Sequence, residues 1–294
     1  RSGQVTVYSS TVELGQGART VLAQLAAEAL GVPYQQVRVV DPDTDRTPFD
    51  NRTTSSRSTY MMGNAVRQAA LALRERLLLA AAQRLEVEPA DLELVDGSVR
   101  VTGAPASALT FGQLVEASGQ EELVEHGEFR NQGGLDPDTG QGIASSHWHQ
   151  GAGAVEVEVD TWTGKVTIVR AHASVYAGQV VNRHTAELQN LGNIVFGVGS
   201  ALFEELVYDQ GQLVNPNLSD YLIPSFLDLP ERMTHDLLER PGAEIHGLGE
   251  TALPPIPAAV GNAVARAIGA RVTELPLTPE RVLRAIRARG GERG

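Results

Sequence analysis

One carboxylate stands out by its neighbours: Glu250, in the stretch "GLGETALPPIP" at residues 247–257. Glycine lets a backbone approach another group closely or take a positive φ. Proline opens a helix well, because the first helical positions need no N–H donor. The stretch therefore predicts a loop, then the acid, then a helix start. A carboxylate placed there is either a surface charge or a general base, and a general base must lie within reach of a reacting group.

Two other stretches place small hydrogen-bonding side chains directly before a predicted helix. The residues concerned are Gln16 and Gly17 in "GQGART", and Ser55, Ser56, Ser58 and Thr59 in "SSRST". A helix N-terminus favours anions through its free N–H groups and its dipole. Two such junctions in one chain indicate a shared anionic ligand, and the alternatives are an ordinary tight turn at the first and simple helix capping at the second.

The sequence "HWH" at residues 147–149 has the residue types of a metal site. No carboxylate follows at a familiar ligand spacing, and catalytic zinc needs three protein ligands. We therefore interpret His147, Trp148 and His149 as the edge of a strand or a loop.

Hydrophobic spacing and turn residues predict the elements that must position these groups. Helices are expected over 16–30, about 61–84, 109–118, 185–206, 257–269 and 279–289, strands over 3–13, 36–41 and 233–240, and hairpins over 91–101, 154–176 and 207–214. Strands and helices alternate without a strict βαβ rhythm, which favours an α+β fold of mixed layers. Residues 119–151 have little periodicity, and we expect there a long excursion and a boundary between two parts, 1–145 and 146–294.

Three glycines, Gly192, Gly197 and Gly199, fall inside the helix predicted over 185–206. Each costs roughly 1 kcal/mol relative to alanine. We therefore expect close packing or the close approach of a ligand to offset that cost.

Composition excludes several classes of function. The chain has 294 residues, a net charge of −12 and no cysteine. Nucleic-acid binding needs a basic surface, and no apolar run approaches the 18 residues of a membrane span, so we expect neither a nucleic-acid nor a membrane partner. Cysteine nucleophiles and cysteine-ligated iron–sulfur clusters are excluded within this chain. The opening "RSGQVTVYSS" has no initiator Met and no signal-peptide pattern, so we expect a fragment or a processed subunit, located in the cytoplasm.

Four stretches occur in an order and spacing more specific than any one of them: "ELGQGARTVLAQLAAEALG", "DTDRTPFDNRTTSSRSTYMMGNAV", "NPNLSDYLIP" and "GLGETALPPIPAAVGNAVARAIG…LPLTPERVLRAI". Over nearly the whole chain they resemble the C-terminal half of the molybdenum-binding large subunit of the xanthine dehydrogenase / aldehyde oxidase family. The resemblance implies a molybdenum-cofactor-binding-domain-like fold with two lobes. It also implies a cofactor, molybdopterin, in bacteria often the cytosine dinucleotide form.

The resemblance also implies a reaction, the hydroxylation of an aldehyde or N-heterocycle with oxygen derived from water. Glu250 matches the acid of the family's "GxGE" motif, which acts as the general base. Positions that contact the cofactor match Gln16, Gly17, Ser55, Ser56, Ser58, Thr59 and Gln189. The implied partners are the N-terminal half of the large subunit, iron–sulfur and FAD subunits or domains, and a small-molecule substrate; a homo-oligomer is also allowed.

The chain departs from the family pattern at Leu188, Asn193 and Phe196, where the family has Gly, Gly and Gln. The first half of the large subunit is absent, so we expect this chain alone to be inactive and free of cofactor. The alternative is a non-catalytic homologue, an assembly or binding lobe with the same fold. The departures favour that alternative, and the intact Glu250 argues against it.

Overall fold

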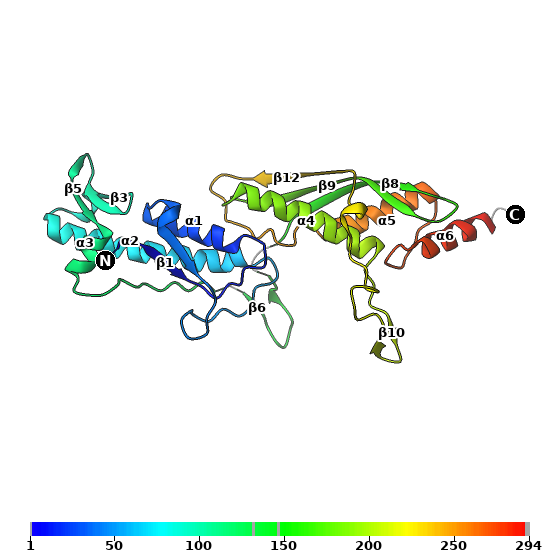
Figure 1. Ribbon diagram of the computed structural model, residues 1–294, viewed down its shortest axis with the longest axis horizontal. Helices are drawn as coiled ribbons and strands as arrows, with labels where there is room; N and C mark the ends of the chain where they lie inside the picture. Colours follow the sequence, from blue (N-terminus) through cyan, green and yellow to red (C-terminus); the bar gives the residue numbers. More distant parts are fainter. Residues whose placement is uncertain (1, 131–132, 146–147, 292–294) are drawn as a thin grey trace. The chain divides into compact units, whose positions relative to one another are not determined.

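The computed structural model describes residues 2–130, 133–145 and 148–291. Its contacts divide the chain into two compact units, Arg1–His147 and Trp148–Gly294. Figure 1 draws the first unit in blue to green and the second in green to red. The functional assignment of the parts 1–145 and 146–294 stays a prediction.

The first unit combines helices with three small sheets in its described residues. Its elements are β1 (Val5–Tyr8), α1 (Ala18–Leu30), β2 (Val37–Val40), a π-helical turn (Ser58–Met62), α2 (Gly63–Leu85), β3 (Leu92–Val95), β4 (Ser98–Val101), β5 (Ala104–Thr110), α3 (Phe111–Ala117), β6 (Gly134–Leu135) and β7 (Gly142–Ile143). β1 pairs with β2 in parallel, and β3, β4 and β5 form an antiparallel sheet. α1 packs against α2, so both predicted helix starts belong to one helix pair.

Glycines set both ends of α1. The helix begins after Gly17, at φ 81°, and ends at Gly31, at φ 60°. Both values lie in the left-handed region that glycine tolerates without a steric cost. A Cβ on Gly31 would lie 2.6 Å from the carbonyl oxygen of Leu94, so the end of the helix also packs directly on β3. The face that carries Val21, Leu22 and Leu25 is buried, as the helical spacing predicts.

The first part of the predicted excursion, residues 119–130, is packed along α2. A Cβ on Gly127 would lie 1.9 Å from the carbonyl oxygen of Ala65. Arg76 pairs with Glu125 at 2.8 Å. This stretch lacks helical or strand periodicity because individual contacts, and not a repeating pattern, hold it.

The second unit is a three-stranded sheet with two helices packed on it. Its elements are β8 (Gly151–Val159), β9 (Val166–Gly178), α4 (Arg183–Leu202), β10 (Tyr208–Asp209), β11 (Gln212–Leu213), β12 (Arg232–Glu239), α5 (Pro255–Ile268) and α6 (Pro279–Gly291). The strand order is β12-β9-β8, with β9 parallel to β12 and antiparallel to β8. α4 packs against β9 and β12, and α5 packs against β8 and α4. Side chains from these elements form one core that includes Val175, Ile194, Ile256, Val260 and Val264.

Close packing explains two of the three glycines inside α4. A Cβ on Gly197 would lie 2.5 Å from Cβ of Ile256 on α5, and one on Gly199 would lie 2.0 Å from Oε1 of Glu204. A Cβ on Gly192 would meet nothing within 4 Å. The expectation of close approach therefore holds within this chain for Gly197 and Gly199 only.

The mixed α+β fold and all three predicted hairpins are confirmed. One helix start differs from the prediction. Ser58 and Thr59 lie inside a π-helical first turn, and no side chain caps it. The helix predicted from about 61 therefore begins about one turn earlier, at the residues chosen as its cap. Within the described residues, no helix has both the length and the apolarity to cross a membrane.

Candidate functional site

Glu250 lies where an irregular segment turns into α5. Residues 251–254 form a turn, and Pro255 is the first residue of the helix. The N–H of Leu253 donates to the carbonyl oxygen of Glu250 at 3.3 Å. The predicted order of loop, acid and proline-started helix is therefore confirmed.

The segment before Glu250 is fastened to the end of β9. Ile245 forms a β-bridge with Gly178, and the N–H of His246 donates to the carbonyl oxygen of Ala177 at 3.2 Å. Gly178 has φ 63°, and a Cβ there would lie 1.9 Å from the carbonyl oxygen of Glu244. Glycine at 178 is thus required both for its backbone conformation and for the close approach of the loop.

A buried amide on α4 holds the middle of the same loop. Asn193 is 1% exposed, and its Nδ2 donates to the carbonyl oxygen of Leu248 at 3.3 Å. A carbonyl group next to a core needs such a donor, because a buried polar group without a partner is costly. Asn193 is one of the departures from the family pattern, and here it supports the loop that carries Glu250.

A threonine and a histidine hold the far side of the loop. Thr251 is 4% exposed; its hydroxyl donates to the carbonyl oxygen of Gly247 at 3.2 Å and lies 2.7 Å from Nδ1 of His149. A hydroxyl has one proton, so when Thr251 donates to Gly247, Nδ1–H of His149 is the donor in the second bond.

His149 also lies within electrostatic range of Glu250. Burial lowers the pKa of His149, and the charge of His246 lowers it further, while the Glu250 carboxylate acts in the opposite direction. The Glu250 residue itself is exposed in this chain. His149, the second histidine of the "HWH" stretch, therefore lies near Glu250. His147 lies outside the described residues. Among the residues described, no group of three potential metal ligands occurs.

The "GQG" turn is held by an acid that sequence reasoning missed. The carboxylate of Glu13 accepts hydrogen bonds from the N–H groups of Gly15, Gly17 and Arg19 at 2.9, 2.9 and 3.1 Å. Burial raises the pKa of Glu13, but these backbone bonds outweigh it, and the pKa is lowered overall. The first turn of α1 therefore already holds an anion from its own chain, which corrects the expectation that it offers an open anion site. An acid four residues before a helix-starting glycine was the available signal.

Gln16 is also engaged within its own turn. Its Nε2 donates to the carbonyl oxygen of Val12 at 2.8 Å, and its Oε1 accepts from the N–H of Leu14 at 2.5 Å. The amide still has one N–H and one lone pair for another partner.

The "SSRST" stretch has an unusual backbone. Ser55 and Ser56 both take left-handed conformations, at φ 57° and 53°, and the π-helical turn follows at Ser58. Such conformations cost about 1–2 kcal/mol per residue for L-amino acids and cluster at binding and catalytic sites. Within the described part of the chain, the hydroxyls of Ser55, Ser58 and Thr59 make no hydrogen bond.

The structure brings these two stretches together within the first unit. The N–H of Val12 donates to Oγ1 of Thr53 at 2.9 Å, and the hydroxyl of Thr11 donates to Asp50 at 3.3 Å. α1 also contacts the π-helical turn. The predicted positions around Gln16 and Ser55 are therefore neighbours, although they are about forty residues apart in the sequence.

In the second unit, Gln189 lies half-buried on α4, the helix that holds the Glu250 loop through Asn193. The next residue, Asn190, is fully buried, and neither polar atom of its side chain has a partner among the residues described. Sequence reasoning did not single out Asn190.

Comparison with known proteins identifies the family to which the chain belongs. The family model for the molybdopterin cofactor-binding domain matches residues 1–230. The 6-hydroxypseudooxynicotine dehydrogenase complex subunit gamma of Paenarthrobacter nicotinovorans is 35% identical over 96% of this chain and 36% of that protein. The putative xanthine dehydrogenase molybdenum-binding subunit XdhA of Escherichia coli K12 is 35% identical over 96% of this chain and 38% of that protein. The crystal structure of quinoline 2-oxidoreductase from Pseudomonas putida 86 matches with a TM-score of 0.79 and 33% identity, over 97% of this chain and 37% of that one.

These likenesses define a class, the molybdenum-binding subunits of oxidoreductases, whose fold this chain has. The chain belongs to the molybdopterin cofactor-binding domain family. It spans a little over a third of the length of the curated relatives described above.

Proposed function

We propose that the chain is the C-terminal cofactor-binding portion of a molybdenum hydroxylase that acts on an aldehyde or an N-heterocycle. The family match supports this, and so does the order in which the chain presents the family's motifs. The single observation that carries the catalytic part is the construction of the Glu250 loop. A bridge to Gly178 and hydrogen bonds from Asn193 and Thr251 hold the backbone that leads to an exposed carboxylate.

The residues of the first unit fit a polar, phosphate-bearing cofactor. Ser55, Ser58 and Thr59 offer hydroxyls that make no hydrogen bond within the described residues, on a backbone with two left-handed serines. Ser56 lies in the same turn, and the Gln16–Gly17 turn is adjacent. We assign these residues to molybdopterin, and Gln189 of α4 to the same cofactor. Because Glu13 occupies the N-terminus of α1, we expect the cofactor to contact these side chains and the serine turn. We do not expect it to contact the end of the helix.

Glu250 is proposed as the general base. When bound, the cofactor supplies the redox centre for the oxidation of the substrate carbon. The Glu250 carboxylate accepts a proton from the water-derived nucleophile, and the fastened loop keeps it in one position. A well-placed base of this kind contributes a factor of about 10² to 10⁴ in rate.

The remaining parts of the proposal concern the assembly. We propose the rest of the large subunit and iron–sulfur and FAD subunits as partners, the cytosine dinucleotide as the pterin form, and the cytoplasm as the compartment. Turnover then requires the assembled enzyme, and this chain alone is inactive.

The test is Glu250→Gln in the assembled enzyme. We expect turnover to fall by about 10² to 10⁴ with unchanged molybdenum content, because the amide keeps the shape of the acid but accepts no proton. Glu244→Gln is the matched control, since Glu244 is an exposed acid of the same loop. Its backbone carbonyl oxygen accepts from the N–H of Gln179 at 3.3 Å, and the substitution leaves that bond in place. Wild-type turnover by the Glu250 variant would remove the proposed base.

A non-catalytic binding lobe is the second candidate. It is favoured by Leu188 and Phe196, two departures from the family pattern that are exposed on α4. An assembled protein that holds molybdenum and oxidises none of a panel of aldehydes and N-heterocycles would support this candidate over the hydroxylase.

A further inference from the structure

Residues 204–229 form a projection from the second unit that we call the arm. It leaves the end of α4, carries the β10–β11 hairpin and returns to β12. Figure 1 shows the hairpin standing clear of α4, α5 and the sheet.

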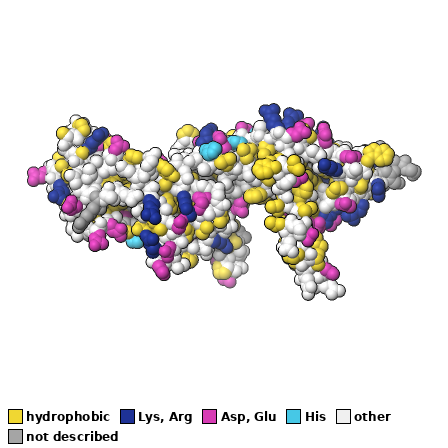
Figure 2. All heavy atoms as spheres, viewed as in Figure 1, with side chains coloured by type: hydrophobic (Ala, Val, Ile, Leu, Met, Phe, Trp, Pro, Cys, Tyr) yellow, Lys and Arg dark blue, Asp and Glu magenta, His cyan; other side chains and the backbone are white. Residues whose placement is uncertain are grey.

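The arm is covered with exposed apolar side chains. They are Leu206, Val207, Tyr208, Leu213, Val214, Leu218, Leu222, Ile223, Phe226 and Leu227. Phe226 and Leu227 are 94% and 96% exposed. Figure 2 shows hydrophobic side chains running down this projection. Scattered apolar residues are normal on a surface, but a concentration of this kind marks an interaction site.

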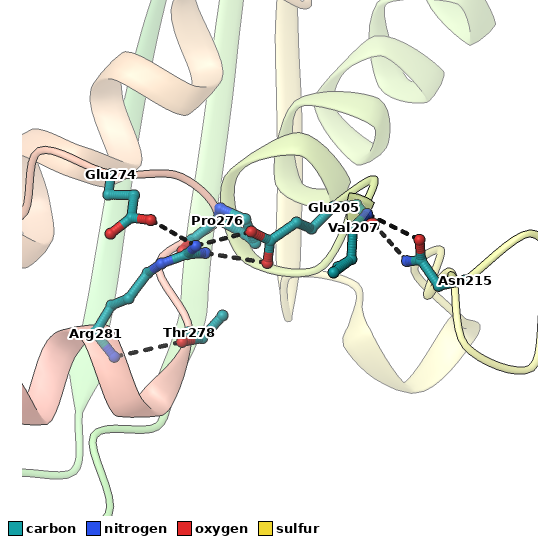
Figure 3. A network of polar contacts seen from close by, with 7 residues as sticks. All are labelled: Glu205, Val207, Asn215, Glu274, Pro276, Thr278 and Arg281. Atoms are coloured by element: carbon teal, nitrogen blue, oxygen red, sulfur yellow. Dashed lines mark hydrogen bonds and ion pairs between the residues drawn. The ribbon is translucent and has the colours of Figure 1, made fainter. Parts of the chain in front are cut away.

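Polar contacts fix the base of the arm to the rest of the unit. The guanidinium of Arg281, from α6, pairs with Glu205 and Glu274, each at 2.8 Å (Figure 3). Asn215 closes the hairpin: its Oδ1 accepts from the N–H of Val207 at 2.9 Å, and its Nδ2 donates to the carbonyl oxygen of Glu205 at 2.7 Å.

Further contacts fix the returning segment of the arm, residues 221–228. The hydroxyl of Tyr221 donates to Glu204 at 2.7 Å, and Oε1 of Glu204 lies against Gly199, 2.0 Å from where a Cβ would be. A capping box between Ser225 and Asp228 holds the turn that presents Phe226 and Leu227. The apolar surface is therefore preformed, which lowers the entropic cost of binding.

The charge on the arm has one sign. Residues 204–229 contain Glu204, Glu205, Asp209, Asp220 and Asp228 and no Lys, Arg or His. A partner that fits must offer an apolar depression, with cations at its rim.

We propose that the arm docks on the part of the molybdenum-binding subunit that this chain does not span. The two relatives that match 96% of this chain are covered over only 36% and 38% of their own length. The remainder therefore makes up well over half of each of those subunits, and it belongs to the same polypeptide. This inference rests on family membership and on the assembly proposed above, but not on the role of Glu250.

The absence of cysteine from the chain gives a direct test. Leu227→Cys introduces one reactive thiol at the tip of the exposed turn, and Gln83→Cys places a control thiol at an exposed polar position of α2. Maleimide labelling of each thiol is followed by mass spectrometry, in the isolated chain and in the assembled enzyme. We expect the thiol at 227 to react at least about tenfold more slowly in the assembled enzyme, because an interface core excludes water and reagents, and the thiol at 83 to react equally in both.

Three results would overturn the proposal. Equal labelling at 227 in both samples would show an open arm. Protection in the isolated chain that grows with its concentration would show a second copy as the occupant. Protection that appears only when the iron–sulfur or flavin subunit joins would show a different subunit. Phe226→Cys serves as the second probe if the first variant does not assemble, and turnover of Glu250→Gln has no bearing on any of these outcomes.

Discussion

Two asparagines on one face of α4 differ in what their amides contact. Asn193 donates to the carbonyl oxygen of Leu248 and so holds the Glu250 loop, whereas the amide of Asn190 has no partner in the described part of the chain. Both side chains are at most 1% exposed. Burial is therefore the same for the two, and only the hydrogen bond distinguishes them.

This contrast predicts opposite effects of one substitution. Asn193→Leu leaves the Leu248 carbonyl group without its donor and should lower the free energy of unfolding by about 1–3 kcal/mol. Asn190→Leu removes two unpaired polar atoms and should leave that free energy unchanged or raise it by about 1 kcal/mol. Urea denaturation of the two variants measures the difference. A loss for Asn190→Leu as large as for Asn193→Leu would show that the Asn190 amide has a partner.

His149 gives the environment of Glu250 a pH dependence. Burial, with the charge of His246, holds the pKa of His149 below its ordinary 6.5, against the opposing effect of Glu250. The unfolded chain therefore takes up this proton more readily than the folded chain. The contribution of His149 to stability is fully present above pH 6.5 and is lost as the pH falls toward the folded pKa.

The corresponding measurement compares wild type with His149→Gln, which keeps a donor for Thr251 but does not titrate. We expect the free energy of unfolding of the wild type to fall more steeply than that of the variant between about pH 7.5 and about pH 5.5. Other groups titrate equally in both proteins and cancel in the difference. Parallel curves would contradict the assigned pKa shift.

At the scale of elements, the start of α1 depends on Glu13. Its carboxylate accepts from three N–H groups of the "GQG" turn and the first helical turn. Glu13→Gln removes the charge at the positive end of the helix and weakens these bonds, so we expect a loss of about 0.5–2 kcal/mol in the free energy of unfolding. Because the folded pKa of Glu13 is lowered, this stabilisation is present at neutral pH and is lost as the pH falls through the acid range.

Glu28→Gln is the matched control for Glu13, because Glu28 is an exposed acid near the other end of the same helix. A negative charge has no favourable interaction with a helix C-terminus. Thermal melts followed by circular dichroism should show a loss for Glu13→Gln alone. Equal effects of the two substitutions would exclude a capping role for Glu13.

Element types were predictable where the signal is local. Glycine and proline marked the ends of α1 and the start of α5, and alternating residues marked β8 and β9. The packing of residues 119–130 on α2 was not predictable, since it depends on contacts such as Gly127 with Ala65 that leave no periodic pattern. The same holds for the left-handed serines, because serine has no intrinsic preference for that conformation.

The candidate site was predictable only in part, for a similar reason. Glu250 was visible because its glycines and prolines are adjacent in sequence. The roles of Thr251, His149 and Asn193 were not, because the contacts that hold the Glu250 loop join residues as much as about one hundred positions apart.

For the whole molecule, each unit has its own core. The clusters around Leu22 and Leu77 lie within residues 1–147, and the cluster around Ile194 and Val264 lies within 148–294. The residues proposed for the cofactor lie in both units, whereas Glu250 lies in the second alone. Because Gln189 shares the second unit with Glu250, a test of Glu250 must also measure molybdenum content.

The most direct test of that role is the rate at which substrate reduces the metal centre of the assembled enzyme in a single anaerobic turnover. In the proposed enzyme this step would come before electron transfer to the proposed partner subunits, so it isolates the chemistry assigned to Glu250. We predict that Glu250→Gln slows this reduction by about 10² to 10⁴, while molybdenum content and the rate of the Glu244→Gln control stay at wild-type levels. Reduction of the Glu250→Gln enzyme at the wild-type rate would contradict it.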